Sequence, residues 1–144
     1  MTDVSEDLRA WARGMYALEA AVELLTRWSS GRFAASGYPW IQPTTEGRHD
    51  WWLDAESITD VALAPYSGGE QRILRIVASL AGGAPVHLDD VLSGNDRDAT
   101  ALVLAAVAHA AGSHDYPNIV VDQEAGVARN LGRFPTLYEW PSRD

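Results

Sequence analysis

Apolar side chains recur at alternating three- and four-residue steps along residues 5–28, and the opposite face carries arginine and glutamate. The recurring positions are Leu8, Trp11, Met15, Leu18, Val22, Leu25 and Trp28. This period predicts one long amphipathic helix that packs on a core. Glu6 and Asp7 favour its start, and the sequence SSG at 29–31 favours its end. A helix-mediated dimer along the same apolar face is the alternative.

The period changes over residues 38–55, where the aromatic runs YPWIQP and HDWWLDA flank the turn-rich TTEG. This pattern predicts a β-hairpin. Pro39 and Pro43 have no backbone N–H, so the first strand is expected at an edge or in an irregular position. Trp51 and Trp52 are adjacent and must point to opposite faces of a strand, so only one is expected to enter the core.

Two further helices follow. SGGE at 67–70 matches the S-x-x-E capping box and precedes apolar positions up to residue 80, with glycines 82–83 as the stop. Asn95 and Asp98 form an acidic variant of the box before a helix that is apolar on most sides and ends at Gly112. A helix of that composition is expected near the centre of the protein.

The C-terminal part contains three strand candidates, at residues 118–122, 127–131 and 136–140, with a turn at 123–126. We find no internal repeat and no low-complexity linker. The elements together predict a single α+β domain over residues 1–144, with three main helices packed on a small, mostly antiparallel sheet.

A chain of 144 residues that is 47% hydrophobic can bury a substantial core. It has no cysteine, which excludes disulfides, thiolate metal sites and cysteine nucleophiles. Residues 1–11 lack a signal-peptide pattern, and the longest apolar stretch, 99–111, is too short to span a bilayer. We therefore expect a cytoplasmic protein that does not enter membranes.

Twenty acidic residues oppose eleven arginines, and there is no lysine, so the formal charge is −9. A surface that follows nucleic-acid phosphates needs several cations on one face, so direct nucleic-acid binding is not expected. An acidic chain is instead steered toward basic protein surfaces, or it mimics nucleic acid in the groove of a DNA-handling enzyme.

One segment resembles part of an ABC-type ATPase. SGGEQ at 67–71 resembles the signature sequence, VHLDD at 86–90 a Walker B strand, and SGND at 93–96 the D-loop. The resemblance implies a composite nucleotide site completed by a partner, because a Walker A loop needs a lysine that this chain lacks. The residues implied in nucleotide contact are Ser67, Gly68, Gly69, Asp89 and Asp90. A capping box alone also explains the first three.

A second resemblance covers most of the chain. ARGMYALEAAVELL and the block from SGGEQRILRIVASL to AHAAGSH are similar to a group of small uncharacterised actinobacterial proteins. This resemblance implies a free-standing small domain from a high-GC bacterium or its mobile elements. It does not imply any particular activity.

The histidines and serines form no catalytic or metal-binding pattern. His114 and Asp115 approach His109 only if the chain turns back after Gly112, and two histidines with a carboxylate would then suit zinc or iron. No HExxH, HxH or GxSxG spacing is present. We therefore expect no metal, no cofactor and no catalytic residues.

The most informative excess is aromatic: the chain has six tryptophans. Trp40, Trp51 and Trp52 share one predicted hairpin with Arg48, and tryptophan is enriched among interface anchors. Core covering is the alternative role. The sequence thus predicts a non-catalytic acidic domain that binds another protein through this hairpin, with homodimerisation through the first helix or an edge strand also allowed.

Overall fold

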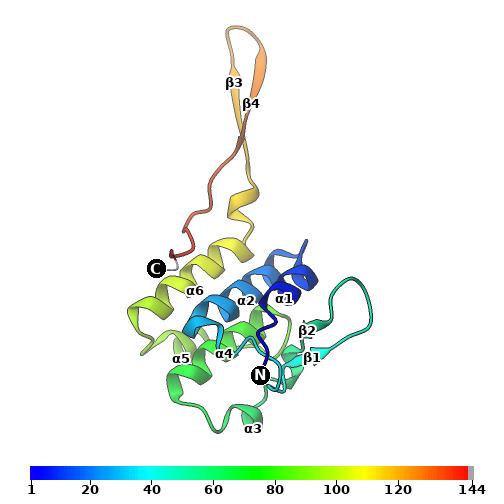
Figure 1. The fold of residues 1–144 in the computed structure, drawn as a ribbon. Coiled ribbons are helices and arrows are strands. Elements are labelled where there is room, and N and C mark those ends of the chain that lie inside the picture. Colours follow the sequence, from blue (N-terminus) through cyan, green and yellow to red (C-terminus); the bar gives the residue numbers. More distant parts are fainter. Residues whose placement is uncertain (143–144) are drawn as a thin grey trace.

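The computed structural model describes residues 1–142, an α+β fold with six α-helices and two separate two-stranded antiparallel sheets in that range (Figure 1). None of these helices is long and apolar enough to cross a membrane. The α-helices are α1 (Ser5–Ala12), α2 (Tyr16–Arg27), α3 (Asp60–Leu63), α4 (Gly68–Leu80), α5 (Leu88–Leu92) and α6 (Arg97–Ala110). The strands are β1 (Ile41–Pro43), β2 (Trp51–Leu53), β3 (Pro117–Asp122) and β4 (Val127–Arg133). Short 3-10 turns are η1 (Trp28–Gly31), η2 (Ala55–Ser57) and η3 (Ser113–Asp115).

Residues 5–28 form two helices, which corrects the prediction of a single one. α1 and α2 are separated at residues 13–15, where Gly14 has φ +99°. Glycine adopts this conformation without the strain that a Cβ would add. The N–H of Gly14 donates to Glu19 Oε2 at 3.0 Å, which ties the break to the first turn of α2. Apolar positions on both sides of the break pack on the same core, but Met15, which lies at the break, is 62% exposed.

α2 is the centre of the helical body, where it contacts α1, α4 and α6 (Figure 1). Ala20 and Ala21 on α2 are fully buried, as are Ala105 and Ala106 on α6. Such short side chains allow helix backbones to approach closely. The helices therefore pack chiefly on one another, whereas the sequence had predicted packing on a sheet.

Both predicted helix caps exist, one of them displaced by a residue. Ser67 and Glu70 form the predicted capping box of α4, with Ser67 Oγ accepting the Glu70 N–H at 3.2 Å and Glu70 Oε1 accepting the Ser67 N–H at 3.0 Å. At α6 the cap is Asp96, whose carboxylate accepts a first-turn N–H at 2.7 Å. Asn95, which we expected to be the cap, instead accepts a hydrogen bond from Arg72 Nε at 3.1 Å.

The predicted hairpin of residues 38–55 is confirmed as β1 and β2. Its register pairs Ile41 with Leu53, and both side chains are buried. Trp40 immediately precedes β1, and its Nε1–H donates to the carbonyl of Phe33 at 3.0 Å. The Trp40 ring belongs to an aromatic cluster with Phe33, Tyr38 and Tyr66.

β3 and β4 form a hairpin that projects away from the body, with both strands close to their predicted ranges (Figure 1). We call residues 117–133 the arm. The third predicted strand, 136–140, is wrong. There the chain leaves the arm and is fixed to the body by side-chain contacts: the N–H of Leu137 donates to Ser113 Oγ at 3.0 Å, and Trp140 packs against the core.

Candidate functional site

The tryptophan hairpin is largely committed to the core. Trp40 is fully buried and cannot contact a partner, so it is not part of the contact surface that the sequence predicts. Trp51 and Trp52 are both half-buried, and the Trp52 indole packs against that of Trp11 with ring centroids 6.1 Å apart. Arg48 is exposed. Partner binding by Arg48 and the exposed edges of Trp51 and Trp52 stays a prediction.

The glycine-rich segment that resembles an ABC signature is a capped helix start. The Ser67 hydroxyl and the Glu70 carboxylate are both used by the capping box, and the hydrogen bond from the Ser67 N–H lowers the pKa of Glu70. Gly68 and Gly69 begin α4 beside the guanidinium of Arg72, which lies 3.4 Å from where a Cβ on Gly68 would be. The capping of α4 therefore explains the residues of this motif, and the explanation requires no ligand.

The two carboxylates of the Walker B-like stretch lie on a helix. Asp89 and Asp90 are exposed in the first turn of α5, and residues 86–90 form no strand. Asp90 lines a pocket of about 320 Å³ with Arg75 and His87. Neither Ser67 nor glycines 68–69 line that pocket. The predicted nucleotide-contacting residues are therefore not gathered in one cavity, and nucleotide contact stays a prediction.

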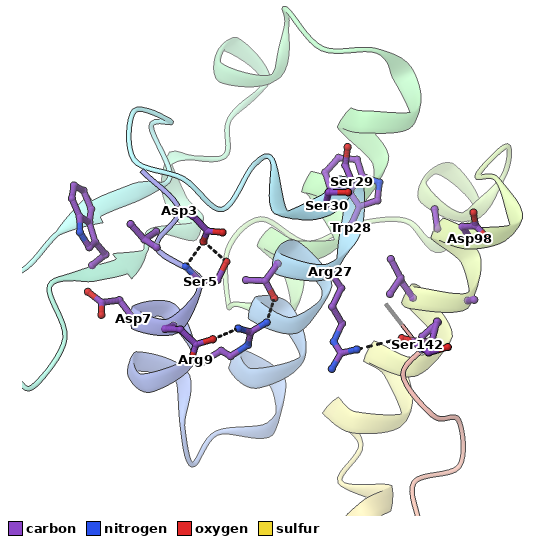
Figure 2. A pocket seen from close by; sticks show the side chains of 18 of the residues that line it. Asp3, Ser5, Asp7, Arg9, Arg27, Trp28, Ser29, Ser30, Asp98 and Ser142 are labelled. Carbon is purple, nitrogen blue, oxygen red and sulfur yellow. Dashed lines mark hydrogen bonds and ion pairs between the residues drawn. The ribbon is translucent and has the colours of Figure 1, made fainter. Parts of the chain in front are cut away.

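A groove of about 1170 Å³ is bordered by the N-terminal segment, the ends of α2 and α6, and the C-terminal tail (Figure 2). Arg9 and Arg27 extend into it. Their Nε atoms each donate to Glu23 at 2.7 Å. Burial raises the pKa of Glu23, but the hydrogen bonds from Arg27 and Arg9 outweigh it and lower the pKa. Arg27 also lies over the Trp140 ring, 5.0 Å from its centroid. Both guanidinium groups are thus engaged within the protein and hold α1, α2 and the tail together.

One rim of this groove is a left-handed turn at Ser29 and Ser30, with φ of 51° and 57°. Gly31 continues it with φ +75°. Positive φ is uncommon outside glycine. Here the turn reverses the chain so that Trp28 and Phe33 stack, with ring centroids 4.8 Å apart and planes at 10°. Packing of these two rings gives the strained turn a structural role.

The arm exposes apolar side chains that nothing in residues 1–142 covers. Every residue of β4 is exposed, and so are four of the six residues of β3. The exposed fractions are 55% for Ile119, 62% for Val121 and 60% for Leu131. Val120 and Val127 are exposed as well, and so are Phe134 and Leu137, which follow the arm in the chain. This is the largest grouping of exposed apolar side chains along the described chain.

Exposed apolar side chains lie on both faces of the arm, and on one face they are accompanied by Asp122 and Arg129. Directly paired residues of an antiparallel sheet share a face. The pair Val121 and Ala128 therefore lies on one face with Ile119, whereas Val120, paired with Arg129, lies on the other. The arm carries Asp122 and Glu124 against Arg129 and Arg133, so its net charge is zero in a chain of −9.

At the base of the arm the structure gathers three potential metal ligands from separate elements. Glu19 lies on α2, His109 on the last turn of α6 and His114 on η3, and one ligand atom of each lies within 4.8 Å of the others. His109 Nε2 donates to Glu19 Oε1 at 2.9 Å. Burial raises the pKa of Glu19, but the hydrogen bonds from the Gly14 N–H and from His109 outweigh it and lower the pKa.

His114 approaches His109 because the chain turns back after Gly112, and the carboxylate beside the two histidines is that of Glu19 and not that of Asp115, which the sequence offered. Glu19 was missed altogether, because it lies about ninety positions away from both histidines in the chain. The sequence predicts the two strands of the arm, but it contains no pattern that shows whether the hairpin is covered by other elements. Comparison with family models, curated proteins and solved structures finds no match to the chain.

Proposed function

We propose that this protein acts by binding protein chains, that the arm is its contact element, and that the arm pairs with the arm of a second copy. The single observation that carries the proposal is a projecting hairpin with apolar side chains exposed on both faces. This keeps the non-catalytic interaction role that the sequence predicts and moves its main surface from the tryptophan hairpin to β3 and β4.

An isolated two-stranded hairpin is marginally stable in water, and three or more strands or a covering helix are normally needed. β3 and β4 pair only with each other, and no helix of residues 1–142 packs extensively against them. Burial of their valine, isoleucine and leucine side chains would contribute about 25 cal/mol for each Å² of apolar surface removed from water. A second chain that packs on the arm would therefore provide the additional strands or covering surface that the two-stranded hairpin lacks.

The backbone of the arm offers a second mode of contact. Each strand has one edge whose N–H and C=O groups face away from its partner strand, and such edges template the addition of another strand. Recognition by strand addition uses main-chain hydrogen bonds for affinity and alternate side chains for specificity. A second copy carries the same arm, and a two-fold axis between the copies makes this surface complementary to itself.

The charge of the chain is compatible with a second copy as the partner of the arm. Two bodies of this acidic chain repel each other, but the arm is neutral and projects from the body. A six-residue strand such as β3 spans about 20 Å, at about 3.4 Å per residue. That exceeds the Debye length of about 8 Å at physiological ionic strength, so arms can pair while the repulsion between bodies is screened. A strongly basic partner would gain little from this neutral surface.

The test is the molar mass in solution, measured by light scattering and sedimentation over a range of protein concentrations. We expect the wild type to dimerise and Val121→Asp to be monomeric, because the variant places a charge in the apolar contact. Val61→Asp is the matched control, since Val61 is 85% exposed on α3 and far from the arm in sequence. It should dimerise like the wild type. Far-UV circular dichroism of both variants verifies folding.

A wild type that stays monomeric up to its solubility limit would overturn self-pairing, as would a Val121→Asp dimer of unchanged affinity. Raising the salt concentration should leave the dimer intact or strengthen it, because its contact is apolar and the bodies repel. Dissociation by salt would instead favour contacts between charged groups. The nucleotide-binding and nucleic-acid-mimic alternatives stay predictions.

A further inference from the structure

The cluster at the base of the arm contains a buried polar atom without a partner. Among the described side chains, His114 Nδ1 is the buried nitrogen or oxygen that forms no hydrogen bond. A buried polar group left unpaired destabilises a folded protein unless a ligand satisfies it. The orphaned nitrogen belongs to one of the three residues whose ligand atoms converge. In the neutral tautomer that carries its proton on Nε2, His114 Nδ1 has a free lone pair that can bind a metal ion.

From this convergence we infer that Glu19, His109 and His114 form a binding site for a divalent transition-metal ion of the zinc class. Two imidazole nitrogens and one carboxylate oxygen are a donor set that zinc and non-haem iron use in proteins, with a remaining position open to water. The site goes beyond the proposed contact function and does not depend on it.

The two oxygens of the Glu19 carboxylate have different partners. Glu19 Oε2 accepts the N–H of Gly14 at 3.0 Å, which fixes the side chain. Glu19 Oε1 faces His109 Nε2 at 2.9 Å, and a metal ion would replace the proton that they share. Hydrogen-bonded support of this kind orients ligands and is a regular part of metal sites.

The chain turn after α6 brings His114 to His109. Gly112 has φ +73°, and a Cβ there would lie 3.1 Å from the Tyr16 ring. The same ring packs edge-on against both imidazoles, with centroids 6.0 Å from His109 and 4.7 Å from His114. The tyrosine hydroxyl donates to the carboxylate of Asp115. These contacts hold the two histidines next to each other.

Metal binding requires a small adjustment of the rings. The imidazole planes are 11° from parallel, and nitrogen lone pairs lie in the ring plane, so one ring must turn for both to reach one ion. Zinc–ligand bonds of about 2.0–2.2 Å in a tetrahedral site place ligand atoms about 3.4 Å apart. The ligand atoms here lie within 4.8 Å of one another, so they must move closer together to hold one ion.

The experiment is calorimetric titration of the full chain with zinc chloride, together with the visible absorption of the cobalt(II) form. We expect one ion per chain and a cobalt spectrum of low coordination number. His114→Gln and Glu19→Gln should each weaken zinc binding by about tenfold or more, since even outer-shell changes cost about 10- to 100-fold. His87→Gln is the control, because His87 is exposed beside Asp89 and Asp90, and it should bind zinc like the wild type.

Absence of zinc and cobalt binding by the folded wild type would overturn the site. So would binding that the folded His114→Gln and Glu19→Gln variants retain at full affinity, or that His87→Gln loses. Circular dichroism establishes that each variant is folded before titration. Because the wild-type titration is decisive by itself, the inference remains testable even if a variant does not fold. A monomeric protein that binds zinc would refute self-pairing and leave this site intact.

Discussion

The imidazole rings of His109 and His114 are stacked, with centroids 4.2 Å apart and planes 11° apart. His109 lies in the last turn of α6, and His114 lies in η3, shortly before the arm. The arm is also held at this point by Arg133, whose Nη1 lies 2.5 Å from Asp115 Oδ1. The stacked pair therefore lies where the projecting arm joins the helical body, so changes at this junction should affect both parts.

Gly112→Ala should destabilise the protein through this junction. The new Cβ would meet Tyr16 at 3.1 Å and would sit on a left-handed backbone. Gly126→Ala is the control, because its φ is +65° but nothing lies within 4 Å of the added atom. The left-handed conformation alone costs about 1–2 kcal/mol.

Urea unfolding should therefore show a larger loss of free energy for Gly112→Ala than for Gly126→Ala. The difference reports the contact with Tyr16. Equal losses for the two variants would show that the Tyr16 ring moves aside without a loss of stability, and would contradict close packing of Tyr16 against Gly112.

Glu23→Gln should lower the free energy of unfolding at neutral pH, and it should lower this free energy much less in acid. The pKa of Glu23 is lowered in the folded protein, so its contribution is present above the unfolded pKa of about 4.3 and is lost as the pH falls through the folded value. Hydrogen bonds to charged groups contribute about 1.5–3 kcal/mol, and Glu23 accepts two from Arg9 and Arg27. Urea unfolding from about pH 7 to about pH 3 measures the change.

The free-energy gap between wild type and Glu23→Gln should narrow as the pH falls below about 4. Glu6→Gln is the control, because Glu6 also pairs with Arg9 but its side chain is 90% exposed. Exposed substitutions usually change stability by less than about 0.5 kcal/mol. A gap that stays constant with pH would mean that Glu23 acts through packing and not through its charge.

Ser67→Ala should cost about 1 kcal/mol of stability, the usual effect of losing a helix N-cap. The hydroxyl accepts the Glu70 N–H, and an alanine side chain has no oxygen to replace it in the capping box. Ser93→Ala, at an exposed position after α5, is the control and should be nearly neutral. Thermal unfolding with and without magnesium-ATP measures both effects.

We expect magnesium-ATP to leave the melting temperature of the wild type unchanged, since Ser67 and Asp90 do not share a pocket. A rise in the wild type that is absent in Ser67→Ala would contradict the purely structural role. It would then support the nucleotide contact that the ABC resemblance implies.

Local features were the most predictable part of the fold. The capping box at Ser67 and Glu70 depends on atoms three residues apart, so the sequence contains all of its partners. The turn between β3 and β4 was likewise predicted from residues 123–126. The break at Gly14 was not, because helices on both sides of it keep the same apolar period. A glycine within such a period has the same spacing whether or not the helix continues.

The candidate sites were less predictable than the fold because each depends on segments that are distant in sequence. Trp40 was expected at a contact surface, but Phe33, Tyr38 and Tyr66 surround its ring and the Phe33 carbonyl accepts its N–H. Tryptophan is suited to cores and interfaces alike, so composition does not separate the two. The sequence shows that the chain is rich in tryptophan, but only the packing determines which tryptophans are buried and which are exposed.

From the sequence alone one obtains an acidic α+β domain without cysteine or lysine, its helix starts, and the two strands of the arm, because charge, capping and periodicity are properties of neighbouring residues. Only the tertiary structure decided that the first helix breaks, that the arm is left uncovered, and that Glu19 meets His109 and His114. The physical reason is that exposure and convergence are properties of surfaces brought together by packing, and residues ninety positions apart leave no periodic trace of their contact.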